Sequence, residues 1–285
     1  MYSFPRTTVG GVSLPRMIVG TNWILGYSHT GAAADAMIKR THHSPESITA
    51  MLLAALENGV DAMMAPFGGN TVLLDAIHRA EEIAEKKVIL IDTPNIDVSD
   101  SKEGREKAWA KIEESRKNGA TFCLIHHAAA EQLVDKHAGT LRRIDDYTSM
   151  IREAGMIPGL SAHMPELILY SDRNGYDVET YIQLYNCMGF LMQVEVEYIN
   201  QVIWNAKKPV MTIKSMAAGR CSPFVGISFA YNTIRPCDMV TMGAFNPDEV
   251  HEDVEIALAA IEHRRANIGG RATPNKTAAL GGKVK

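Results

Sequence analysis

The chain has 285 residues, 46% of them hydrophobic and 22% charged, and its 29 basic and 33 acidic side chains leave a formal net charge of −4. These ordinary values exclude an intrinsically disordered chain, and no apolar run approaches the roughly 18–20 residues that span a bilayer. The first six residues do not resemble a secretory leader, so we expect a cytoplasmic protein without a membrane partner.

Eight short apolar or β-branched runs alternate with amphipathic segments, which predicts a parallel sheet with crossover helices. In chain order the runs cover residues 16–23, 60–66, 87–93, 121–127, 156–163, 190–198, 209–216 and 238–245. Eight successive strand–helix units close into a (β/α)8 barrel, whose usual size is about 250 residues. We therefore predict an α/β fold, with a single TIM-barrel domain over residues 1–263.

The expected helix ends support this count. Ser44-Pro45, Ser222-Pro223 and Asn246-Pro247 each place a capping side chain before a proline, which is typical of the first turn of a helix. Asn118-Gly119 and Gly155 stop two further helices just before a predicted strand. The sequence contains no linker that would divide the chain into two domains.

Residues 264–285 form a basic C-terminal tail with six basic side chains and no acidic one, so the remainder of the chain carries a net charge of −10. An acidic body and a tail without aromatic side chains argue against a nucleic-acid partner. We expect the tail to be solvated or to contact a second subunit, and it is the sequence's only indication of a homo-oligomer.

The cysteines are few and widely spaced. None forms a Cys-x-x-Cys pair, so we expect neither a disulfide framework nor a structural zinc site, and a reducing compartment fits best. The four residues are Cys123, Cys187, Cys221 and Cys237.

The carboxyl ends of the strands form the active site of a barrel of this kind. In the strand predicted at 190–198, residues alternate between an apolar and a polar face. If the apolar face meets the helices, Glu195 and Glu197 lie inside the barrel. A structural ion pair with Lys214 is the alternative, because buried carboxylates are costly unless they meet a cation or donors.

Other predicted strands end in polar side chains that would meet these carboxylates. Imidazole and carboxylate together favour a divalent metal ion, for which the candidate ligands are Asp92, His126, His163 and Glu195. Glu197, Lys214 or His126 would then transfer a proton. A desolvated Lys214 could instead form a Schiff base.

The loops at the same end offer a place for the substrate. Asn22, Trp23 and Tyr27 follow the first strand and could orient or stack on a ligand. Arg220 and Gly243 follow the last two strands, where such barrels often bind phosphate. A small and anionic substrate is therefore expected.

Several segments resemble the aldo-keto reductase family over most of the chain. They are Val19-Gly20-Thr21-Asn22-Trp23, residues 54–60, Ile125-His126, residues 194–198 and residues 242–249. The resemblance implies a (β/α)8 barrel and NAD(P) as a cofactor. It also implies a catalytic aspartate, tyrosine, lysine and histidine, of which only the histidine, His126, is present. Phe67 stands near the expected tyrosine, and Asp92 or Thr93 stands at the lysine position.

These observations favour a metal-assisted lyase or isomerase that moves a proton next to the carbonyl group of a small sugar or sugar acid. The alternative is an NAD(P)-dependent oxidoreductase with a different proton donor, because a phenylalanine cannot protonate an alkoxide. A third reading is a barrel subunit without catalytic activity.

Overall fold

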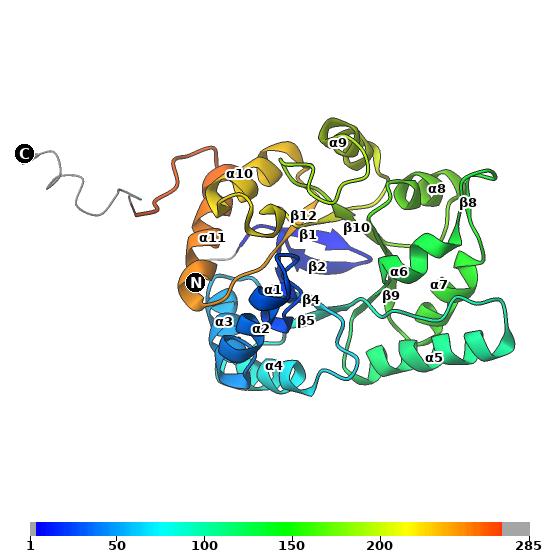
Figure 1. The fold of residues 1–285 in the computed structure, drawn as a ribbon, viewed down its shortest axis with the longest axis horizontal. Helices are drawn as coiled ribbons and strands as arrows, with labels where there is room; N and C mark the ends of the chain where they lie inside the picture. Colours follow the sequence, from blue (N-terminus) through cyan, green and yellow to red (C-terminus); the bar gives the residue numbers. More distant parts are fainter. Residues whose placement is uncertain (1–3, 270–285) are drawn as a thin grey trace, which may run out of the picture.

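The computed structural model describes residues 4–269, in which eight parallel strands form a closed barrel surrounded by helices (Figure 1). The barrel strands are β3 (Met17–Gly20), β4 (Ala62–Ala65), β5 (Ile89–Asp92), β6 (Phe122–Ile125), β9 (Ile157–Ala162), β10 (Thr180–Leu184), β11 (Val210–Ile213) and β12 (Met239–Met242). Each strand pairs with the next along the chain, and β12 pairs with β3 to close the ring. The predicted (β/α)8 barrel is confirmed.

The outer layer consists of helices that follow the barrel strands along the chain. They are α3 (Pro45–Glu57), α4 (Thr71–Ala84), α5 (Lys102–Lys117), α7 (Ile144–Glu153), α8 (Glu166–Asn174), α9 (Val196–Asn205), α10 (Pro223–Thr233) and α11 (Pro247–Ile261). The three predicted caps are confirmed: Ser44, Ser222 and Asn246 each accept a hydrogen bond from a backbone N–H in the first turn. Capping is local chemistry, which is why the sequence predicts it well.

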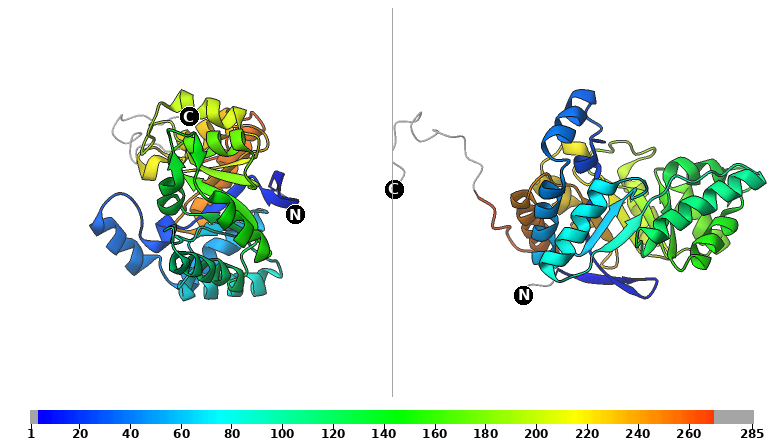
Figure 2. Two further views of the ribbon diagram at one scale, coloured as in Figure 1. Left: turned by 90° about the vertical axis from the view of Figure 1, so that its right-hand side faces the viewer. Right: turned by 90° about the horizontal axis from the view of Figure 1, so that it is seen from below.

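Apolar side chains fill two separate layers. Ile18, Ile91 and Met211 belong to a cluster inside the barrel, whereas their strand neighbours pack outward against the helices. The antiparallel hairpin of β1 (Arg6–Val9) and β2 (Val12–Pro15) adds Val9 and Leu14 to the interior cluster and so closes the amino-terminal end. Figure 2 shows this hairpin and α2 (Ala32–Thr41) at opposite ends of the barrel.

The sixth barrel strand is the one element that the sequence analysis misplaces. It is β10 (Thr180–Leu184), and all five residues are buried. The segment predicted to be a strand crosses the surface instead and enters α9, with Glu195 at its N-cap. Its alternation is real, because Met192, Val194 and Val196 pack against the core. The polar face between them meets solvent rather than the barrel interior.

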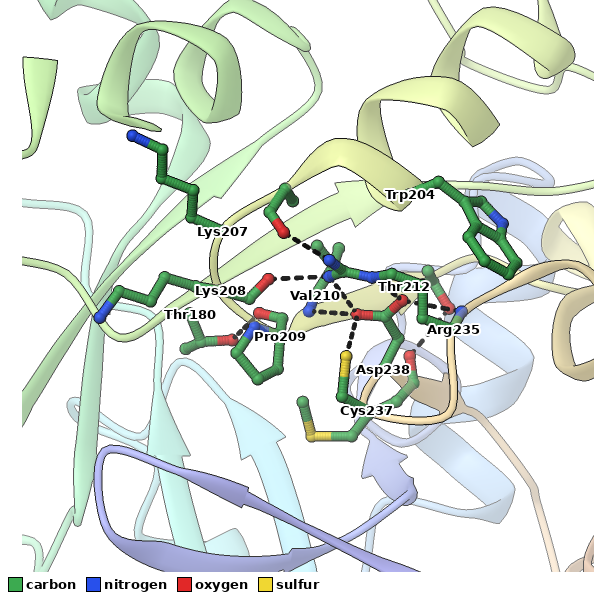
Figure 3. A network of polar contacts seen from close by, with 12 residues as sticks. Thr180, Trp204, Lys207, Lys208, Pro209, Val210, Thr212, Arg235, Cys237 and Asp238 are labelled. Atoms are coloured by element: carbon green, nitrogen blue, oxygen red, sulfur yellow. Dashed lines mark hydrogen bonds and ion pairs between the residues drawn. The ribbon is translucent and has the colours of Figure 1, made fainter. Parts of the chain in front are cut away.

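An ion pair joins the amino-terminal ends of the last strands (Figure 3). The Asp238 carboxylate, which is fully buried, accepts hydrogen bonds from the Arg235 guanidinium, the Arg235 backbone N–H and Val210 N. Arg235 also donates to the carbonyl oxygens of Ala206 and Lys208, and Arg16 donates to the carbonyl of Asp238. One buried pair thus links the segments that enter β3, β11 and β12.

Between residues 4 and 269, none of the helices is both long and apolar enough to cross a membrane. The described start of the basic tail folds back on α11, where Arg264 forms ion pairs with Glu255 and Glu262. Arg271, Lys276, Lys283 and Lys285 lie outside the described residues. A domain boundary at residue 263 stays a prediction.

Candidate active site at the carboxyl ends of the strands

Three histidines stack at the carboxyl-terminal mouth of the barrel. His126 follows β6, His127 begins the short helix α6 (His127–Ala130), and His163 follows β9. The ring centroids of His126 and His127 are 4.2 Å apart, and those of His127 and His163 are 3.8 Å apart. Strand alternation predicts that only one of the first two faces inward. Both join the cluster, because β6 ends at Ile125 and strand alternation does not apply to the residues after it.

Lys214 reaches the same cluster by an unusual backbone turn. In β11, Met211 and Ile213 lie against the barrel interior, and Thr212 between them donates a hydrogen bond to the carbonyl of Met239. Lys214 has a φ of 59°, in the left-handed region that non-glycine residues rarely adopt. Its Nζ lies 2.9 Å from Nε2 of His29. Lys214 therefore reaches the mouth through this turn and not through the alternation of the strand before it.

The mouth favours neutral side chains. Burial lowers the pKa of His126 to about 4 and that of His163 to about 3, and neighbouring His127 and Lys214 add to both shifts. Burial also lowers the pKa of Lys214 to about 8. At neutral pH the imidazoles are therefore uncharged, and a neutral imidazole can coordinate a metal ion through its unprotonated nitrogen. In His126, Nδ1 already accepts a hydrogen bond from Ala128 N.

Glu131 completes the cluster and was missed in the sequence. The donor atoms of His127, Glu131 and His163 all lie within 4.8 Å of one another. Oε1 of Glu131 accepts hydrogen bonds from His163 N at 2.6 Å and Met164 N at 3.1 Å, which leaves Oε2 for a ligand. The signal was present, because residues 127 and 131 are four apart and lie on one face of a helix.

Two of the four predicted metal ligands lie elsewhere. Asp92 is buried, but it faces the helix layer, where it accepts from Phe67 N and interacts with Ser115 of α5, and burial raises its pKa. Ile91 occupies the interior face of that strand, so the predicted direction of Asp92 is wrong. Glu195 and Glu197 are exposed at the start of α9, so their predicted place inside the barrel is also wrong.

Trp23 covers the ends of the last two barrel strands. Its indole meets the Phe245 ring edge-on at 4.8 Å and lies so close to Gly243 that a Cβ there would be 2.3 Å from Trp23 Cδ1. The same indole lies beside Gly219, where an added Cβ would be 3.4 Å from Trp23 Cη2. The predicted loop residue Trp23 is therefore at the mouth, and Gly243 supports it.

The remaining predicted substrate contacts divide into two groups. Asn22 Nδ2 lies 3.4 Å from His29 Nε2, and Arg220 donates to the His29 carbonyl while its guanidinium lies 3.8 Å above the Phe190 ring. Asn22 and Arg220 therefore both lie beside His29, whose ring contacts Lys214. Tyr27 donates from its backbone N–H to the carbonyl of Asn22, but its side chain is 54% exposed and lies beside Lys39 of α2.

No family model matches the chain, and no curated protein matches it. Solved structures do. One is a protein from Pseudomonas aeruginosa assigned to the aldo-keto reductases, with a TM-score of 0.64 and 13% identity over 90% of this chain and 95% of that one. An aldo-keto reductase from Klebsiella pneumoniae in complex with NADPH has a TM-score of 0.57 and 15% identity, covering 94% and 92%.

The barrel is also similar to an enzyme of another class. A truncated 3-deoxy-D-arabino-heptulosonate 7-phosphate synthase from Thermotoga maritima has a TM-score of 0.52 and 10% identity, covering 92% of this chain and 90% of that one. Identities this low establish the fold alone, and one fold supports many reactions. The expected fold resemblance is confirmed: the chain has the (β/α)8 barrel that aldo-keto reductases also have.

Proposed function

We propose that this chain is an enzyme that binds a divalent metal ion through His127, Glu131 and His163 and transfers a proton next to a carbonyl group. The convergence of these three donors beside Lys214 supports the proposal. Two imidazoles and a carboxylate are a ligand set typical of catalytic zinc and of other first-row metals. A bound ion would polarise a substrate carbonyl.

Lys214 is the proton carrier in this proposal. Its pKa of about 8 keeps a useful fraction of the amine neutral near pH 7, so it can accept a proton and return it. His29, 2.9 Å from Lys214 Nζ, orients the amine, and Asn22 contacts the same imidazole nitrogen. The reaction would be isomerisation, elimination or aldol cleavage of a small sugar or sugar acid. Arg220, at the rim of the mouth, would bind an anionic group of this substrate.

The fold is compatible with such a reaction. The structures that the chain resembles include an aldo-keto reductase and a synthase, so enzymes of more than one class have this barrel. Enzymes with this fold generally have their active sites at the carboxyl ends of the strands, where this histidine cluster lies.

Metal binding tests the proposal directly. Chain purified without chelator and then loaded with Zn²⁺, Mn²⁺ or Ni²⁺ should retain about one ion after gel filtration, measured by elemental analysis. His163→Ala and Glu131→Gln should weaken retention by roughly 100-fold or more. His78→Ala is the matched control, because His78 is exposed on α4 far from these donors in the sequence. Equal metal content in all four proteins, or none, would refute the site.

A nicotinamide cofactor is the alternative, supported by the NADPH in the structure from Klebsiella pneumoniae. The residues here fit its phosphates poorly. Trp23 fills the space over Gly243, and Glu249 accepts from Phe245 N at 2.8 Å, which places a carboxylate at the start of α11. We expect NADPH to leave the fluorescence of Trp23 unquenched. Saturable quenching that Trp23→Phe abolishes would favour the oxidoreductase.

A further inference from the structure

Two cysteines that are far apart in the sequence meet at the barrel mouth. The Sγ atoms of Cys187 and Cys221 are 4.0 Å apart, and both residues are half-buried free thiols. Cys187 follows β10 and Cys221 follows β11, so the contact lies between two neighbouring loops. A disulfide has an S–S distance of about 2.05 Å, so the sulfurs need to approach by about 2 Å.

The backbone around each thiol is positioned for this contact. The Asn186 side chain accepts from Met188 N and Phe190 N and so holds a tight turn around Cys187. Cys221 N donates to the carbonyl of Met216. Arg220, the residue before Cys221, stacks on the ring of Phe190 in the loop after β10. This cation–π contact already links the two loops.

We propose that Cys187 and Cys221 are a redox modification site, in which a reversible disulfide ties the loop that carries Lys214 to the neighbouring loop after β10. Lys214 lies in the loop that carries Cys221, and Arg220 contacts the carbonyl of His29, whose ring meets Lys214. A bond that fixes Cys221 to the β10 loop therefore narrows the rim through which a ligand reaches the lysine.

The oxidant is a low-molecular-weight disulfide such as glutathione disulfide. One cysteine thiolate attacks it, forms a mixed disulfide and releases one thiol. The second cysteine then attacks the protein sulfur of the mixed disulfide and releases the other thiol. Two electrons pass from the cysteine sulfurs to the reagent, and the two thiol protons end on the released thiols. Burial and the neighbouring Cys187 raise the pKa of the Cys221 thiol, which lowers its thiolate fraction and so slows its reaction with the oxidant.

The test uses the full chain, treated with glutathione disulfide and then digested without reduction. Mass spectrometry should find the linked peptide of Cys187 and Cys221, lighter than the sum of its two reduced parts by two hydrogen atoms, and dithiothreitol should reverse the link. Cys187→Ser and Cys221→Ser should each lose the link, whereas Cys237→Ser, which changes a cysteine outside the pair, should keep it. Retained glutathione adducts on the wild-type pair, or a link through Cys237, would overturn the assignment.

A second readout measures the effect on the mouth. Acetylation of Lys214 by acetic anhydride, followed by peptide mass, should be several-fold slower in the oxidised wild type than in the reduced one. Cys187→Ser, which cannot form the bond, should show no such difference. Equal rates in the two redox states of the wild type would show that the bond, where formed, does not control access to Lys214.

Discussion

At pH 8, Lys214 is expected to react with acetic anhydride about 10-fold faster than a lysine of ordinary pKa with equal access. Burial lowers its pKa from 10.5 to about 8, so half of its side chains are neutral at that pH. For a lysine of pKa 10.5, only about 0.3% are neutral at the same pH, and only the neutral amine attacks. The lower basicity and partial burial of Lys214 reduce the advantage but do not reverse it. Competitive labelling followed by peptide mass measures the ratio.

The internal reference is Lys102, whose side chain is 93% exposed on α5. The reactivity of Lys214 should rise with pH and level off above about pH 8, while that of Lys102 keeps rising. The groups that face Lys214 are His29, His126, His127 and His163, which are largely uncharged in this range. A Lys214 profile that follows Lys102 would remove the basis for its role as proton carrier.

The same shift affects stability with a definite sign. Between pH 8 and 10.5 the unfolded chain binds more protons than the folded one at Lys214, so this residue makes the free energy of unfolding rise with pH. The destabilisation caused by burying the charged Lys214 side chain is present in full below pH 8. Lys214→Met should therefore stabilise the protein at pH 7 more than at pH 10, measured by urea denaturation. An equal effect at both pH values would contradict the low pKa.

The sequence predicts the barrel well because its evidence is local. The proline and capping pairs at Ser44 and Asn246 begin helices where they are expected to, and the apolar runs before them form strands. The sixth strand fails for a physical reason. Alternation reports that one face is apolar and the other polar, but a surface loop of turns and bends that leads into a helix can show the same pattern as a strand. Residues 180–184 are buried on both faces, so they carry no alternation at all.

The site is less predictable because side-chain direction depends on where each strand ends. Asp92 closes β5 and points outward to the helices, whereas His127 is two residues past the end of β6 and faces the mouth. Lys214 owes its position to a positive φ, which no residue pattern announces at a lysine. The approach of Cys187 and Cys221 is tertiary and has no sequence signature. What the sequence does identify is the chemistry: imidazoles, a carboxylate and an amine at strand ends.

Asp238→Asn should destabilise the protein by about 3–5 kcal/mol, because it leaves the Arg235 guanidinium buried without its counter-charge. The NH2 group of the new amide would also face backbone N–H donors, such as Val210 N, from which the carboxylate accepted hydrogen bonds. In a chain of this size the loss corresponds to a fall in melting temperature of roughly 6–20 °C, measurable by calorimetry. Glu46→Gln is the control: its pair with Arg79 is exposed, so the expected loss is about 1 kcal/mol or less. If both variants melt within 2 °C of the wild type, the buried pair is not what holds the amino ends of β3, β11 and β12 together.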